Sequence, residues 1–66
     1  MATSQAVRIA REFHDAYERL APEFGYRTRE ESAKPWHEIP PANRSLMVAT
    51  VQDLIDRDVI FPVRFP

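Results

Sequence analysis

Apolar residues return at helical spacing over residues 6–21, which predicts an amphipathic helix. They form one narrow stripe: Ala6, Ile9, Ala10, Phe13, Ala16, Tyr17, Leu20 and Ala21. The opposite face is charged, and pairs of opposite sign four positions apart support a helix there. Thr3 or Ser4 is the expected N-cap. Gly25, the only glycine, is placed to end this helix in the left-handed conformation.

A second helix is predicted after Pro40 and Pro41, because the fixed φ and missing N–H of proline are harmless in a first helical turn. Beyond them the residues at helical spacing are Leu46, Met47, Thr50, Val51, Leu54 and Ile55. Val48 and Val59 widen this apolar arc. So broad an arc predicts packing on two sides, against the first helix and against the connecting loop or the C-terminal tail.

The connecting segment, residues 26–39, lacks sustained periodicity and is predicted to be an ordered loop with one helical turn. Thr28 and Glu31 have the spacing of a capping box that could start this turn. A lone tryptophan in so small a domain usually supplies core area. We therefore expect Trp36 to be mostly buried and to pin the loop by packing on Phe13, Tyr17 or Leu54.

The C-terminal residues 59–66 alternate apolar side chains with other residues, which predicts a short extended segment. Pro62 would limit it to an edge or irregular strand. We expect Phe61 and Phe65 to be covered, either by the helices of the same chain or by another chain. The candidate residues for docking on a partner are therefore Phe61, Val63 and Phe65.

Together these patterns predict a mainly α fold, with two antiparallel helices, an ordered connecting loop and a short extended C-terminal segment. Residues 1–66 have room for a single domain, which buries only roughly 60% of the surface of its unfolded chain. Cysteine is absent, so no disulfide can add stability, and two histidines without cysteines argue against structural zinc. Self-association is the remaining common way for so small a domain to gain stability, and formation of a homodimer is therefore an open alternative.

Nine basic residues balance ten acidic ones, giving a formal net charge of −1. Nucleic acid is not an expected partner, because phosphate binding needs a concentrated basic face. DNA binding through Asn43 and Arg44 of the second helix is the weakest alternative considered.

No apolar run approaches the length that crosses a bilayer, and residues 1–10 lack the pattern of a signal peptide. A cytoplasmic location without membrane contact is therefore expected.

The sequence offers no enzyme site, so no catalytic residue and no cofactor are predicted. Nucleophilic catalysis needs an activated thiol or hydroxyl beside a base, and a single glycine cannot form a nucleotide-binding fingerprint. His14 and Glu18 stand one helical turn apart, and His37 could add a third metal ligand from the loop. Helical His/Glu pairs are more often solvated hydrogen-bonding partners, so no metal site is predicted.

Aromatic and basic side chains gather in the loop. They form the only cluster in the sequence that suggests a ligand-binding site. Arginines beside aromatic rings can hold an anionic or planar ligand through bidentate hydrogen bonds and stacking. The candidate ligand-binding residues are Tyr26, Arg27, Arg29, Trp36 and His37. The alternative is a loop pinned by its aromatics and solvated by its charges.

Three segments in order, RIAREFHDAYERLA, FGY and PWHEIPPANRSLM, resemble the small ryanodine-receptor repeat (RyR) domain of bacterial and bacteriophage proteins. The positions that carry the resemblance are His14, Gly25, Tyr26, Trp36 and Pro40. The resemblance implies a compact two-helix fold, no known catalysis and a recognition role, with nucleotide-like ligands for some members.

The leading hypothesis is a non-enzymatic binding module, encoded by a phage or prophage, that docks on a protein partner. The alternative is a binder of a small anionic or nucleotide-derived ligand through the loop from Tyr26 to His37.

Overall fold

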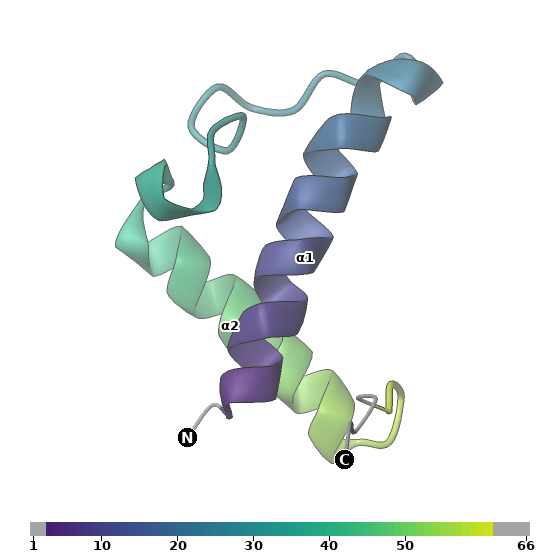
Figure 1. Ribbon diagram of the computed structural model, residues 1–66, viewed down its shortest axis with the longest axis vertical. Helices are drawn as coiled ribbons and strands as arrows, with labels where there is room; N and C mark the ends of the chain where they lie inside the picture. Colours follow the sequence, from purple (N-terminus) through teal and green to yellow (C-terminus); the bar gives the residue numbers. More distant parts are fainter. Residues whose placement is uncertain (1–2, 62–66) are drawn as a thin grey trace.

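Two helices that run in opposite directions and cross each other make up most of the molecule (Figure 1). The computed structural model describes residues 3–61. Helix α1 spans Ser4–Leu20 and continues into a 3₁₀ turn, η1, at Ala21–Phe24. A second 3₁₀ turn, η2, spans Trp36–Glu38 and leads into helix α2 at Pro41–Asp56. The mainly α prediction with two antiparallel helices and a connecting loop is confirmed.

The ends of α1 follow the local signals in the sequence. Thr3 is the N-cap, and its Oγ1 accepts a hydrogen bond from the Ala6 N–H at 3.1 Å. Gly25 ends η1 with φ 70°, and its N–H donates to the carbonyls of Ala21 and Pro22. Apart from Gly25 itself and its two chain neighbours, no atom lies within 4 Å of the position where a Cβ would be added at Gly25, so the backbone conformation alone favours glycine here. Both capping predictions are confirmed.

Helix α2 starts at Pro41, as predicted, and ends in a turn centred on Asp58, whose φ is 58°. The Asp58 N–H donates to the Ile55 carbonyl at 3.1 Å, and the Val59 N–H donates to the Leu54 carbonyl at 2.9 Å. This pair of bonds is a Schellman motif with aspartate in the left-handed position. Val59 and Ile60 therefore belong to the turn instead of an extended segment. Val63 and Phe65 lie outside the described residues.

The core sits where the N-terminal half of α1 crosses α2. Ala6, Ala10 and Val51 are buried at its centre. Partly buried side chains pack around them: Ile9, Trp36, Met47, Val48, Ile55 and Ile60. The small alanines let the two helix backbones approach closely, because the separation of packed helices depends on the side chains at the contact.

The C-terminal half of α1 diverges from α2 (Figure 1), and its large apolar side chains do not enter the core. Phe13, Tyr17 and Leu20 belong to the predicted apolar stripe but are exposed. Leu46 of α2 is exposed as well. The stripe runs the whole length of α1, whereas α2 covers only the part near Ala6 and Ala10. Neither described helix is long and apolar enough to cross a membrane.

Polar contacts also join the beginning of α1 to the end of α2. The Thr3 N–H donates to Gln52 Oε1 at 2.8 Å, and Gln52 Nε2 donates to Asp56 Oδ1 at 2.9 Å. The Gln52 amide thus satisfies one of the free N–H groups at the start of α1 while it is held in place from its own helix.

Candidate functional site

His14 and Trp36 attach the connecting loop to α1. His14 is 4% exposed, and its Nε2 lies 2.6 Å from the carbonyl oxygen of Lys34. A carbonyl can only accept, so Nε2 carries the proton of this bond. The Trp36 ring packs 6.0 Å from the His14 ring, between centroids, at an interplanar angle of 60°. His14 therefore has a structural role, because it links α1 to the loop.

Trp36 is partly buried and packs against the core, but the ring beside it is neither of the two aromatic neighbours that were expected. The aromatic ring beside it belongs to His14, whereas Phe13 and Tyr17 stack on each other at 5.8 Å on the exposed side of α1. His14 follows Phe13 in the sequence, so the side of α1 that faces the loop is rotated by one residue from the apolar stripe.

Side-chain hydrogen bonds join the loop to both helices. Thr28 Oγ1 donates to Glu18 Oε1 of α1 at 2.7 Å, so the predicted capping box with Glu31 is wrong. The single turn instead forms on Arg29, whose carbonyl accepts from the Ser32 and Ala33 N–H groups, both at 2.9 Å. Asn43 Nδ2 of α2 donates to Ser32 Oγ at 3.3 Å.

The structure brings together only part of the predicted ligand site. Tyr26 and Arg29 line a hollow of about 220 Å³ between α1, the loop and α2. Its other lining residues are Phe13, His14, Tyr17, Glu18, Thr28, Ser32 and Met47. Arg27 lines a neighbouring hollow together with Tyr26. Trp36 packs on the core, and His37 lies at the surface 3.5 Å from Glu38. Among the described residues, no three His, Asp or Glu side chains gather where they could hold a metal ion.

An exposed aromatic surface is the main feature that the sequence reasoning missed. It consists of Phe13, Tyr17, Leu20, Phe24 and Tyr26, and we call it the α1 aromatic face. Phe13 is 62% exposed and Phe24 82%. The rings contact one another, because Phe13 stacks on Tyr17 and Tyr26 meets Tyr17 edge-on at 6.3 Å and 81°. The side chains therefore form one continuous surface.

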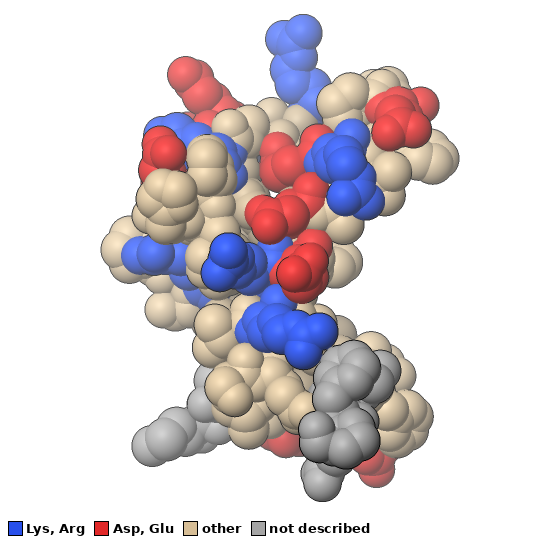
Figure 2. Space-filling view, viewed as in Figure 1, with Lys and Arg blue, Asp and Glu red and all other residues tan. Residues whose placement is uncertain are grey.

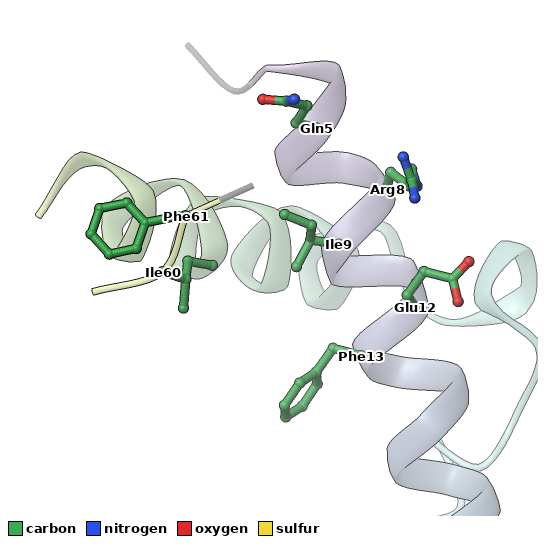
Figure 3. Close-up of a pocket in the computed structure, with 7 residues that line it drawn as sticks. All are labelled: Gln5, Arg8, Ile9, Glu12, Phe13, Ile60 and Phe61. Atoms are coloured by element: carbon green, nitrogen blue, oxygen red, sulfur yellow. The ribbon is translucent and has the colours of Figure 1, made fainter. Parts of the chain in front are cut away.

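Hollows adjoin both ends of this face. At the C-terminal end of α1, Leu20, Phe24 and Tyr26 line one of about 280 Å³. At the N-terminal end, a hollow of about 480 Å³ lies between α1 and the turn after α2, and Figure 3 shows Ile9 and Phe13 facing the side of Ile60. Side chains of another molecule could fit into these depressions.

Phe61 lies at the rim of the N-terminal hollow and is 75% exposed (Figure 3). The helix pair of its own chain therefore does not cover it, and that prediction is wrong. Coverage of Phe61 by another chain stays a prediction.

Charged side chains of both signs are mixed over the side of the molecule seen in Figure 2. The Arg57 guanidinium lies 2.9 Å from Asp53 one helical turn away, and Arg29 lies 4.0 Å from Glu31. Both pairs are exposed, where ion pairs contribute little to stability. The mixed signs on this side do not form the concentrated basic surface that nucleic acid requires.

The chain matches no family model, and no curated protein or solved structure shows significant similarity to it. The resemblance to the RyR domain therefore stays a prediction.

Proposed function

We propose that this chain is a non-enzymatic protein-docking module and that the α1 aromatic face is its docking surface. The observation that carries the proposal is the exposure of five large apolar side chains in one continuous surface. Monomeric proteins rarely expose apolar patches of more than a few hundred Å², and larger ones mark interaction sites. Aromatic residues are enriched in protein interfaces.

The contrast between core and surface supports the proposal. The buried apolar residues are small or few: Ala6, Ala10, Ala21, Ile39 and Val51. Phe13, Tyr17 and Phe24, which would contribute most to a core, lie outside it. A small domain needs all its apolar area for stability. A partner that covers these rings would explain why they lie outside the core. The RyR resemblance, with its recognition role in bacterial and bacteriophage proteins, agrees with a phage- or prophage-encoded docking module.

A photocrosslinking amino acid at Tyr17 tests this proposal directly. In a lysate of the organism that encodes the chain, we expect the probe at Tyr17 to form adducts with protein, including further copies of this chain. Leu46 provides the matched control, since it is 67% exposed and lies on α2 away from the hollows that adjoin the face. Equal adduct yields at Tyr17 and Leu46 would overturn the proposal.

Binding of a small anionic ligand is the second candidate, and it now rests on Tyr26 and Arg29, which share the hollow beside Phe13 and Tyr17. Glu18 lines the same hollow and would repel an anion, so we favour protein docking. If a nucleotide does bind there, it should raise the melting temperature of the wild type but not of Arg29→Ala. Arg44→Ala is the control, because Arg44 lines a different hollow, on α2. An unchanged wild-type melting temperature with a panel of nucleotides would exclude this candidate.

A further inference from the structure

We infer that the occupant of the α1 aromatic face is a second copy of this chain, whose α1 packs antiparallel to the first across a twofold axis near Ala16. This inference rests on the proposed function, because it names the partner of the same docking surface. It draws on the charges beside the face, the relief at its two ends and the size of the core.

Charge complementarity gives the direction of the pairing. Glu12 and Arg19 are both exposed, and each directly precedes a residue of the face, Phe13 and Leu20 respectively. Seven positions are close to two helical turns, so both charges lie along the same edge of the face. In an antiparallel pair related by a twofold axis, equivalent edges of the two copies meet. Glu12 then lies level with Arg19 of the partner subunit when the axis passes between Asp15 and Ala16, and symmetry repeats this pair.

The same register fits the relief of the face. Phe24 follows α1 by four residues, and the axis places Phe24 of the partner subunit level with the first turns of α1. The hollow of about 480 Å³ lies at this level, where its α1 lining runs from Gln5 to Phe13 (Figure 3). Phe24 is the most exposed of the large apolar residues described, and Ile9, Phe13 and Ile60 provide apolar walls for its ring. At the centre, Phe13 would lie beside Tyr17 of the partner subunit.

The small core also favours a second copy as the occupant of the face. A chain of 66 residues without cysteine has little core, and domains of this size often gain stability from oligomerisation. A specific interface needs roughly 1,000 Å² of total buried area, and each large aromatic side chain can bury about 150–250 Å². Five large side chains from each copy, even partly exposed as they are, reach this scale.

Charge reversal at the two edge positions tests the pairing. We expect the wild type to sediment as a dimer at about 100 μM, a concentration at which even a dimer of weak, micromolar affinity is populated. Glu12→Arg alone, or Arg19→Glu alone, places like charges together twice and should weaken the dimer at least tenfold. An equimolar mixture of these two variants should form a heterodimer, since both edge pairs are then of opposite sign. The double variant Glu12→Arg/Arg19→Glu should again form a homodimer.

Arg11→Glu and Asp15→Arg are matched controls, because they make the same charge changes on α1 away from the edge that carries Glu12. They should leave the dimer unchanged, and circular dichroism checks that all variants are folded. A wild type that stays monomeric overturns the inference. A dimer that neither single reversal weakens, or variants that fail to pair when mixed, also overturns it. In each of these cases, Tyr17 adducts with a different protein would still support the proposed function, whereas the absence of any Tyr17 adduct would reject both.

Discussion

At the scale of single residues, the two histidines of this chain have opposite environments. His14 is buried and donates to a loop carbonyl, whereas the side chain of His37 is 77% exposed at the surface. From the sequence alone, both histidines could be considered as metal ligands, because imidazole serves equally as a surface group, a metal ligand or a buried donor. The fold assigns the structural role to His14 by placing Lys34 against α1.

Replacing His14 by alanine should lower the free energy of unfolding by about 1–3 kcal/mol, because the Lys34 carbonyl loses its donor and Trp36 loses its neighbour. His37→Ala is the control and should change stability by less than about 0.5 kcal/mol, as is usual at the surface. Urea denaturation followed by circular dichroism measures both. Equal effects of the two substitutions would contradict the structural role of His14.

Trp36→Ala should cost about 3 kcal/mol, the lower end of the usual range, because the ring is only partly buried. The loop would then lose an apolar contact with the core. Thermal unfolding in the Glu12→Arg background, at a protein concentration where sedimentation finds only monomer, measures the effect without a contribution from the proposed dimer. Phe24→Ala in this background should change little, since Phe24 is exposed. If the Trp36 variant kept the parental melting temperature, its packing against the core would be unimportant.

At the scale of elements, α1 and α2 end in different ways. Gly25 takes the left-handed conformation after η1, whereas Asp58 takes it after α2. For a residue with a Cβ this conformation costs energy, although the short polar side chain of aspartate reduces the cost. The sequence signals the first end through its only glycine, but it gives no comparable signal at Asp58.

Substitutions at the two positions should change stability in opposite directions. Gly25→Ala should cost about 1 kcal/mol through backbone strain, since there is open space for the methyl group. Asp58→Gly should gain about 0.5–1 kcal/mol by relieving the strain in the Schellman motif. Chemical denaturation measures both, and Asp58→Ala separates loss of the carboxylate from the backbone effect. A destabilised Asp58→Gly protein would contradict this account.

At the scale of the whole molecule, the crossing of the two helices depends on alanine at the contact. Ala6 and Ala10 are almost fully buried against α2. Larger side chains at these positions would push the helices apart. The aromatic residues follow in the sequence, where the helices have already diverged.

Ala10→Leu should therefore destabilise the protein by about 1–3 kcal/mol through overpacking. Ala49→Leu makes the same change at an exposed position of α2 and should be nearly neutral. Thermal unfolding of the two variants measures the difference. A stabilised Ala10→Leu protein would show that the crossing has room to spare.

The sequence by itself determined those features that depend on neighbouring residues. Thr3 caps α1, Gly25 ends its 3₁₀ extension, and Pro41 begins α2, because hydrogen-bonding groups and backbone preferences act over one turn of chain. The helical periodicity likewise gave two helices and an intervening loop. The packing of Trp36 against the core followed from the size of its ring.

Only the tertiary structure decided which part of each apolar stripe is covered. Periodicity shows that Ala6, Ala10, Phe13 and Tyr17 lie near one side of a helix, but it does not show where α2 crosses that side. The crossing lies at the alanines, so the aromatic residues beyond it stay exposed. In the fold the Lys34 carbonyl lies against His14, Trp36 packs on the core and the His37 side chain stays at the surface. The predicted ligand site is divided as a result. These outcomes depend on contacts between residues distant in the sequence, and the local pattern carries no information about such contacts.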